Sequence, residues 1–399
     1  MVKYLDRDKF RIFVITRKPV STESLVKLDR VFEVEVEGEV FSRSSGYRYL
    51  MYVLLASYWR KFPFRFGRYI RNSWALNATN VCDGLIRAEK SEGRTCVVIG
   101  TFCPLDALAA ASSVAYRHDI PLIQDFRDGL GFEPIGAQSR AAIWAKAALE
   151  KRLCLNAVCL TAVTVPIVDY LKQRYISDRV RYLPNGYDPS DFDKPDSYFG
   201  RVSSKYFGRA AFSGKFVIGH FGQISVSDPT SLETLRRFAR CLENMDEIVQ
   251  SKIHFVFMGK LTPVEITILS ELKVSVSVLK SRSRIAAIEL MRRVDGLLLL
   301  TGSRSSVATG KIYDYLALSK KIIHVSRVHN EAQRIIAGRI GVYHYLLDDL
   351  ADAEVPKIDW RNIVDGSMPE TPAPLEYSKV VLARNLESMV IGLLENGVV

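Results

Sequence analysis

The sequence predicts an α/β protein with two doubly wound domains. Short apolar runs alternate with helical patterns along the chain, which is typical of strand-helix-strand units and parallel sheets. Ten such runs occur, and these are too many for one twisted sheet. A stretch between Pro184 and Gly214 that is rich in Pro, Gly, Asp and Ser separates the runs into two series. With 399 residues, the chain is long enough to build two hydrophobic cores.

The expected strands and domain boundaries follow from this pattern. Strands of the first series are expected at residues 10–16, 95–100, 121–124, 157–163 and 180–183. Strands of the second series are expected at 216–221, 252–258, 274–279, 296–300 and 321–325. We therefore expect domains at 1–183 and 214–370, joined by a linker at 184–213. The last segment, 371–399, has a helical pattern at 376–394 and is expected to pack back toward the first domain.

The chain is basic, and its charge is unevenly distributed. The net charge is +11, and residues 1–183 hold 28 Lys and Arg against 19 Asp and Glu, whereas the remainder holds 27 against 25. The excess in the first half suits an anionic partner, either a phospholipid surface, a phosphorylated substrate or nucleic acid. Solubility alone is the alternative explanation. A hydrophobic content of 48% with 25% charged residues excludes a disordered chain.

Cysteine usage and hydropathy predict a cytoplasmic protein. The six cysteines lie at irregular spacing without a C-x-x-C pair, which argues against a zinc site and against a disulfide framework. The first ten residues are too charged for a signal peptide. No apolar run approaches the roughly 20 residues that a membrane-spanning helix needs, so we expect no membrane crossing.

The most informative segment is TGKIYDYLALSKKII at residues 309–323. Thr309 and Gly310 can begin a helix after a buried strand, and such helix starts bind phosphates through their unpaired amides. Lys311 and Asp314 share one face of the first turn. A cation there suits a diphosphate, and a carboxylate suits the hydroxyls of a ribose. An ordinary amphipathic helix with a solvated charge pair is the alternative.

A loop with small hydroxyl groups precedes that expected helix. Residues 303–306 read Ser-Arg-Ser-Ser, so Ser303 and its neighbours offer backbone amides and hydroxyls to a phosphate. Arg304 adds a planar guanidinium that can donate in pairs. A plain connecting loop is the alternative.

Charged residues also end an expected strand of the first domain. Asp125, Arg127 and Asp128 follow the run at 121–124, and open α/β sheets bind ligands at the carboxyl ends of their strands. One carboxylate could orient an acceptor hydroxyl or take its proton, while Arg127 holds its neighbours. A structural ion-pair cluster is the alternative. The chain has no Ser-His-Asp pattern, no histidines at metal-ligand spacing and no D-x-D at a strand end, so we expect no metal site.

A basic and aromatic segment follows an apolar run at residues 49–59. Residues 60–74 contain five aromatic rings, no acid and five cations, which are Arg60, Lys61, Arg65, Arg68 and Arg71. Such a pattern is typical of contact with a membrane surface or an acceptor. Single-stranded nucleic acid is an alternative, but no RNA-binding motif is present and we expect no nucleic-acid partner. A core helix with a solvated turn is the other alternative.

Four landmarks occur along the chain in a fixed order. They are IQDFRDGLGFEP at 123–134, LEKRLCLNAVCLTAVTVPIVDYL at 149–171, YLPNGYDPSDF at 182–192 and DGLLLLTGSRSSVATGKIYDYLALSKKII at 295–323. The Pro-Asn-Gly turn alone is common in proteins. The ordered set resembles the GT-B glycosyltransferases, and specifically the retaining enzymes of family 4.

The resemblance implies a GT-B fold, in which two Rossmann-like domains face a central cleft, and a metal-independent glycosyltransferase. Residues of the second domain would bind a nucleotide-sugar, namely Gly222, Gln223, Lys260, Ser303, Arg304, Gly310, Lys311 and Asp314. The first domain would bind a glycan or lipid-linked acceptor, with Asp125, Arg127 and Asp128 in catalytic roles. No cofactor is implied, since the nucleotide-sugar is a co-substrate. The implied setting is bacterial surface polysaccharide or glycoconjugate synthesis in the cytoplasm, with peripheral contact at the inner face of the cytoplasmic membrane.

Departures from the family's pattern leave alternatives open. The chain is expected to start inside the family's first helix, at Tyr4 and Leu5, without the preceding strand and its glycine-rich loop. Ser306 stands eight positions before Asp314, where many members carry an acid. A catalytically inactive or regulatory GT-B protein and a sugar-nucleotide epimerase of the same fold are therefore alternatives. A membrane- or nucleic-acid-binding α/β protein is a third.

Overall fold

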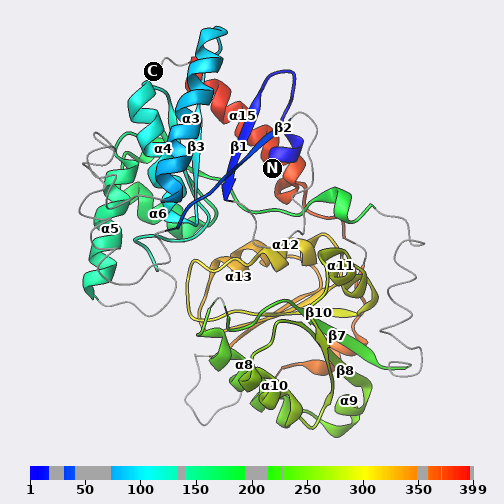
Figure 1. The fold of residues 1–399 in the computed structure, drawn as a ribbon. Coiled ribbons are helices and arrows are strands. Elements are labelled where there is room, and N and C mark those ends of the chain that lie inside the picture. The colour runs from blue at the N-terminus through cyan, green and yellow to red at the C-terminus, as the bar shows by residue number, and fades with distance from the viewer. Residues whose placement is uncertain are drawn as a thin grey trace. The chain divides into compact units, whose positions relative to one another are not determined.

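The computed structural model describes residues 1–17, 31–40, 73–133, 140–193, 214–226, 228–347, 358–369 and 371–395. They form two compact units, each built on a parallel sheet with its own core (Figure 1). The first unit combines Met1–Pro184 with Leu382–Val399, and the second is Asn185–Val381. Within the described ranges, no helix is both long and apolar enough to span a lipid bilayer.

The first unit contains a four-stranded parallel sheet in the order β3-β4-β5-β6. Its strands are β3 (Val98–Phe102), β4 (Leu122–Phe126), β5 (Cys159–Ala162) and β6 (Val180–Tyr182). Its helices before the second unit are α3 (Trp74–Ser91), α4 (Leu105–His118), α5 (Arg140–Cys154) and α6 (Val165–Arg174). β4 and β5 are buried along their whole length, which explains why both are mostly apolar rather than alternating.

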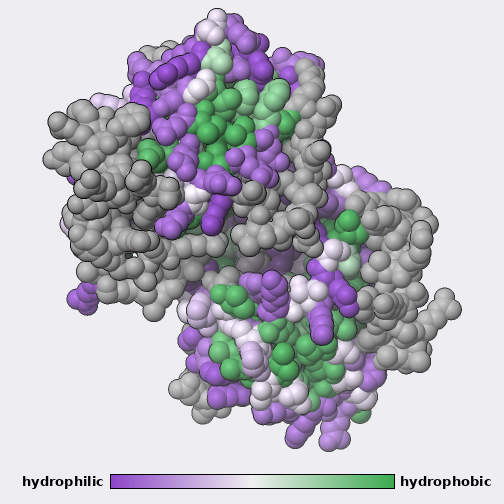
Figure 2. Space-filling model, in the orientation of Figure 1, coloured by the Kyte–Doolittle hydropathy of each residue, from purple (hydrophilic) through white to green (hydrophobic). Residues whose placement is uncertain are grey.

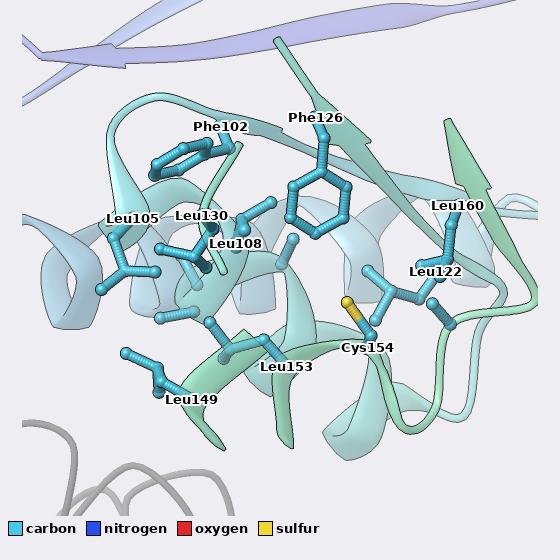
Figure 3. Packing of buried hydrophobic residues seen from close by; sticks show 14 of the residues in the cluster. Phe102, Leu105, Leu108, Leu122, Phe126, Leu130, Leu149, Leu153, Cys154 and Leu160 are labelled. Carbon is cyan, nitrogen blue, oxygen red and sulfur yellow. The ribbon is translucent and has the colours of Figure 1, made fainter. Parts of the chain in front are cut away.

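The core of the first unit forms where these helices pack on the sheet (Figure 3). The rings of Phe102 from β3 and Phe126 from β4 have centroids 6.3 Å apart. Leu108 from α4 and Leu149 from α5 are fully buried beside them. α4 also carries a run of small buried residues, which are Ala109, Ala110, Ala111, Ser112 and Ser113. Small side chains let its backbone approach the sheet and α3 closely.

A separate two-stranded parallel sheet occurs early in the chain. β1 (Ile12–Arg17) pairs with β2 (Val31–Val36), and the rings of Phe13 and Phe32 stack with centroids 5.1 Å apart. Figure 2 shows apolar residues gathered over these strands on the face of the first unit that it displays. β2 was not expected from the sequence, although its apolar residues alternate with glutamates as in a half-buried strand, and only one of its six residues is buried.

The beginning of the chain also differs from expectation. Val2–Tyr4 forms one turn of 3-10 helix, so the chain does not start inside a long helix. The turn ends at Leu5, which has extended backbone angles, and the Asp6 carboxylate then accepts a hydrogen bond from the Asp8 amide (2.9 Å). Such side-chain to backbone bonding favours turns over helices.

The second unit has a six-stranded parallel sheet in the order β12-β11-β10-β7-β8-β9. The strands are β7 (Phe216–Phe221), β8 (Ile253–Gly259), β9 (Ser275–Lys280), β10 (Gly296–Leu300), β11 (Lys321–Ser326) and β12 (Val342–Leu346). The chain enters at β7 in the middle, runs outward through β9, and then returns to build the other half from β10 to β12. This is the doubly wound order, and the strand order reverses between β7 and β10, where such sheets form a ligand crevice.

Helices cover both faces of this sheet (Figure 1). The first face carries α8 (Ser231–Glu243), α9 (Glu247–Lys252), α10 (Pro263–Ser270) and α14 (Trp360–Asp365). The second face carries α11 (Arg284–Arg293), α12 (Gly310–Leu316) and α13 (Glu331–Ile336). On the first face, the rings of Phe238 and Phe255 meet Trp360 edge-on. On the second face, Tyr313 and Tyr315 are fully buried, so α12 is held firmly against the sheet.

The two ends of the second unit lie next to each other. The backbone N–H of Tyr187 donates to the carbonyl of Tyr377 (3.0 Å), and the N–H of Lys379 donates to the carbonyl of Tyr187 (2.9 Å). Turns of 3-10 helix lie beside this junction at Pro189–Asp191 and Leu375–Tyr377. Of the expected linker, the described part after Pro184 therefore belongs to the second unit, and residues 194–213 lie outside the described residues.

The last helix belongs mostly to the first unit. α15 (Lys379–Glu395) begins at the junction, and from Leu382 onward it is part of the first unit. Leu382, Leu386 and Val390 pack in one cluster with Ile123 of β4. The chain thus returns to the unit in which it began.

Candidate functional site

The second unit contains a pocket of about 550 Å³ at the reversal point of its sheet. Gln223 and Ile224 line it from the turn after β7, and Thr301 lines it from the end of β10. α8 and α11 each contribute residues from their first turns, and the loop after β10 contributes Arg304. All the lining residues belong to the second unit, so the pocket is formed within one compact body.

Lys311 is the central cation of this pocket. It lies in the first turn of α12, and its Nζ donates to the carbonyl oxygen of Gln223 (2.7 Å) and lies 3.1 Å from His220 Nε2. His220 Nδ1 is 3.1 Å from the carbonyl oxygen of Leu298. Because a carbonyl only accepts, Nδ1 carries the imidazole proton, and Nε2 is left to accept from Lys311.

Burial controls the charge of this lysine. It lowers the pKa of Lys311 to about 7, and the nearby Glu265 carboxylate opposes that effect. Burial, followed by the positive charge of Lys311, also holds the pKa of His220 well below its usual value, so the imidazole is neutral. Glu265 is itself fixed, because it accepts from the Ser225 amide (2.8 Å) and from the Thr262 amide (2.6 Å). The pocket therefore holds an amine whose protonated form an anionic ligand would favour.

Two glycines shape the turn that lies against Lys311. Gly222 has a φ of +104°, and a Cβ there would lie 3.3 Å from Lys311 Cε. Its amide donates to the carbonyl of Met258 (2.7 Å), and this bond holds the turn after β7 against β8. A Cβ at Gly259 would clash with the backbone of Gly222. Both positions thus depend on the absence of a side chain.

Asp314 lines the same pocket, but its carboxylate is already engaged. Arg284 binds it in a bidentate manner, with Nη1 3.0 Å from Oδ2 and Nη2 2.7 Å from Oδ1. Arg284 Nε also lies 2.8 Å from Asp191 Oδ2. Burial raises the pKa of Asp314, and the hydrogen bonds from Arg284 oppose that rise. Sequence reasoning missed this pairing, since Arg284 follows β9 and lies thirty residues away from its partner.

Arg304 reaches the pocket beside the start of α8. Its Nε lies 3.3 Å from Asp228 Oδ2, and the other oxygen of Asp228 accepts from the amide (3.1 Å) and hydroxyl (2.7 Å) of Thr230. The amide of Ser303 donates to Thr230 Oγ1 (2.9 Å), so the loop after β10 is tied to the loop before α8. A Cβ at Gly302 would clash with Thr230, which makes this close approach dependent on glycine.

The buried His324 contacts both Thr301 at the pocket wall and the partly buried His344. Thr301 Oγ1 lies 2.8 Å from His324 Nε2 and accepts from Asn330 Nδ2 (3.0 Å). His324 Nδ1 is 3.0 Å from His344 Nδ1. Burial, with a smaller effect of His344, lowers the pKa of His324 to about 3, so the pair is neutral. These contacts fix the Thr301 side chain at the pocket wall, and no sequence motif indicated them.

Three of the expected donor-binding residues lie outside the described lining of the pocket. Lys260 follows β8 and is exposed, and it lies outside the set of pocket-lining residues that the structure describes. Ser303 is likewise outside that set, although its neighbour Arg304 lines the pocket. Gly222 shapes the space around Lys311 without lining the pocket. Gln223, Arg304, Gly310, Lys311 and Asp314 are brought together at the pocket wall.

Asp125, Arg127 and Asp128 lie in the first unit, at the carboxyl end of β4. Asp125 is buried, and its Oδ1 accepts from Thr161 Oγ1 (2.7 Å) while its Oδ2 accepts from Arg127 Nε (2.7 Å). Asp128 follows in the turn and is partly exposed. Both oxygens of Asp125 are thus engaged within the unit, as a structural ion-pair cluster would require, and catalytic roles for the three residues stay predictions. Arg60, Lys61, Arg65, Arg68 and Arg71 lie outside the described residues.

Comparison with solved structures identifies the fold. No protein-family model and no curated protein matches the chain. A glycosyltransferase from Rickettsia africae ESF-5 is similar over 96% of this chain and 90% of its own, with a TM-score of 0.62 and 13% identity. An α,α-trehalose-phosphate synthase (UDP-forming) from Burkholderia xenovorans is similar over 95% and 99%, with a TM-score of 0.56 and 11% identity. The S. aureus MnaA structure with UDP is similar over 96% and 97%, with a TM-score of 0.51 and 10% identity.

The fold is GT-B. At these identities the likeness is one of fold, and it confirms the prediction of two Rossmann-like domains. The GT-B likeness extends over nearly the whole chain, because the matches cover 95% of it or more. In this GT-B protein the pocket lies in the second unit, and Asp125 lies in the first.

Proposed function

We propose that the protein is a glycosyltransferase that binds a nucleotide-sugar in the pocket of its second unit. It transfers the sugar, without a metal ion, to a glycan or lipid-linked acceptor in the synthesis of a bacterial surface polysaccharide or glycoconjugate. The observation that carries this proposal is Lys311, a buried cation at the reversal point of a doubly wound sheet. Nucleotides bind at such points in other sheets of this type.

The charges that line the pocket favour a polyanionic ligand. Four cations line it, and they are Arg284, Arg304, Lys311 and Lys379. Two carboxylates, Asp228 and Asp314, line it as well, and each already receives a hydrogen bond from an arginine. The lining thus has an excess of positive charge that a diphosphate would neutralise.

Lys311 is suited to stabilise a departing diphosphate. Negative charge grows on the phosphate oxygens as the bond to the sugar breaks, and a fixed cation stabilises that charge most where water is excluded. Because the amine is held by Gln223 and His220, it needs little reorganisation during the reaction. A bound diphosphate would raise its pKa and keep it protonated. Asp125, Arg127 and Asp128 are proposed to orient the acceptor.

A nucleotide-sugar screen tests this proposal. Thermal shift with UDP-, GDP- and ADP-sugars should give a clear rise in Tm for one nucleotide, and release of free nucleotide should follow when an acceptor is supplied. Lys311→Met should remove the Tm rise, since it deletes the cation at nearly constant volume. Lys252→Met is the matched control, because Lys252 is exposed at the end of α9. Loss of the Tm rise in the control, or its persistence in Lys311→Met, would contradict the proposed site.

A binding protein without turnover is the second candidate. It is favoured by Asp125 and Asp314, whose carboxylates are engaged by arginines, and by the serine at position 306. This candidate predicts a ligand-dependent Tm rise with no release of nucleotide and no epimerised sugar. Epimerised product in the absence of an acceptor would instead indicate a sugar-nucleotide epimerase.

A further inference from the structure

The outer face of α5 combines exposed apolar side chains with cations. Trp144 is 74% exposed, which is the highest value for a large apolar side chain among the described residues. Leu155, just after the helix, is 63% exposed. Arg140, Lys151 and Arg152 are exposed as well. We call these five residues the α5 face.

The opposite side of α5 is buried in the first unit, so the α5 face is the side of the helix that faces solvent. Leu149 and Leu153 are buried in the core of the first unit. Glu150 is 1% exposed, and its Oε2 accepts from the amide of Gly131 (2.8 Å). Glu150 is also the sole acid between residues 140 and 156. The only acid of this segment is therefore buried, and the exposed charged residues of the segment are all basic.

The cations of the α5 face have no counter-charge among the residues that the structure describes. Among the described residues, no ion pair is formed by Arg140, Lys151 or Arg152. Other cations of the same unit are paired, for example Arg117 with Asp83 and Arg94 with Glu89. A basic surface that also exposes a tryptophan complements a partner that is anionic and apolar at once.

We propose that the α5 face docks the first unit on an anionic phospholipid bilayer. Tryptophan prefers the region between lipid headgroups and acyl chains, and lysine and arginine contact the phosphates at the same depth. A helix with one basic and apolar side and one side fixed in a globular core lies in the plane of such a surface. The proposal needs no donor or acceptor, so it stands apart from the proposed function.

Vesicle sedimentation with the full-length protein tests the proposal. Binding to vesicles of phosphatidylcholine with phosphatidylglycerol is expected, and binding to vesicles of phosphatidylcholine alone should be much weaker. Trp144→Ala should weaken the binding about ten-fold because it removes the main apolar anchor. Lys151→Ala with Arg152→Ala should weaken it about five-fold for each cation lost and should reduce its dependence on salt.

A matched control and a local probe separate this face from any other membrane contact. Ile248→Ala removes an apolar side chain that is 66% exposed and lies close to Asp246 and Glu247, and it should leave binding unchanged. Brominated phosphatidylglycerol should quench the tryptophan fluorescence of the protein. Trp144→Phe should abolish the part of that quenching that comes from Trp144. Full quenching in Trp144→Phe, or unchanged vesicle binding in the α5 variants, overturns the proposal. If the α5 variants raise only the KM for the acceptor, the α5 face binds the acceptor and not a bilayer. This result also overturns the proposal.

Discussion

At the scale of single residues, Lys311 is a cation whose charge depends on what occupies the pocket. Its pKa is lowered to about 7 by burial, whereas the ordinary value is 10.5. Between these two values the unfolded chain binds a proton that the folded, empty protein does not. The free energy of unfolding should therefore rise with pH in this range, as far as Lys311 contributes.

Nucleotide binding should show the opposite dependence on pH. A diphosphate favours the charged amine, so binding takes up a proton above pH 7. The affinity for UDP should fall by up to about ten-fold between pH 7.5 and 8.5. Isothermal titration in buffers of different ionisation enthalpy would measure the proton uptake. Lys311→Met should show weak binding without this uptake, and equal uptake in the variant would exclude Lys311 as its source.

The pairing of Arg284 with Asp314 yields a second prediction. Arg284→Met should lower the free energy of unfolding by about 1–3 kcal/mol, because Asp314 is 5% exposed and would lose its counter-charge. Adding Asp314→Asn should recover part of this loss. Urea unfolding of the four variants of the double-mutant cycle measures the coupling. Arg361→Met is the control, since its pair with Asp246 is exposed and screened by water, so its loss should change the stability far less.

The residues of the site could be predicted only in part. Lys311 and Asp314 were accessible from the sequence because they follow a strand and share one helical turn. Arg284, Asp228 and His220 were not, because their contacts join elements that lie tens of residues apart. Asp314 does line the pocket, but its bidentate pairing with Arg284 was not predicted.

At the scale of elements, two glycines have opposite roles, one at the end of β8 and one inside α3. Gly259→Ala should destabilise the protein by about 2 kcal/mol or more and weaken UDP binding, because the new Cβ would strike the Gly222 backbone. Gly84→Ala should stabilise it by about 0.5–1 kcal/mol, because Gly84 is inside α3 and a Cβ there meets nothing within 4 Å. Thermal and urea unfolding of both variants measure the contrast. Equal effects would contradict the packing described at Gly259.

The strands show why some elements are easier to predict than others. β10 reads GLLLL and is buried throughout, so its sequence reflects a central strand. β12 reads VYHYL, and all five of its residues are only partly buried at the edge of the sheet. An edge strand needs fewer apolar residues, and it therefore gives a weaker signal. β2 was missed although it carries such a signal, since its apolar residues alternate with exposed glutamates.

At the scale of the whole molecule, a ligand in the pocket should stabilise the second unit and leave the first unit unchanged, because each unit has its own core. UDP at about 100 times its Kd should add about 2.7 kcal/mol to the stability of the second unit. Hydrogen exchange should slow at residues 216–224 and 296–316, which include the pocket wall, and stay unchanged at residues 98–126 in the first unit. Lys311→Met should abolish the slowing. Equal protection of both units would show that the nucleotide contacts the first unit as well.

The junction between Tyr187 and its two partners, Tyr377 and Lys379, has a further consequence for how the chain is assembled. Because the second unit begins and ends at this junction, it is topologically an insertion within the first, whose sequence resumes at Leu382. Expressed alone, residues 185–381 would have ends that these backbone hydrogen bonds already hold side by side, because all three bonded residues lie within that range. The unit that contains the pocket could therefore be produced separately or exchanged between proteins of the same fold.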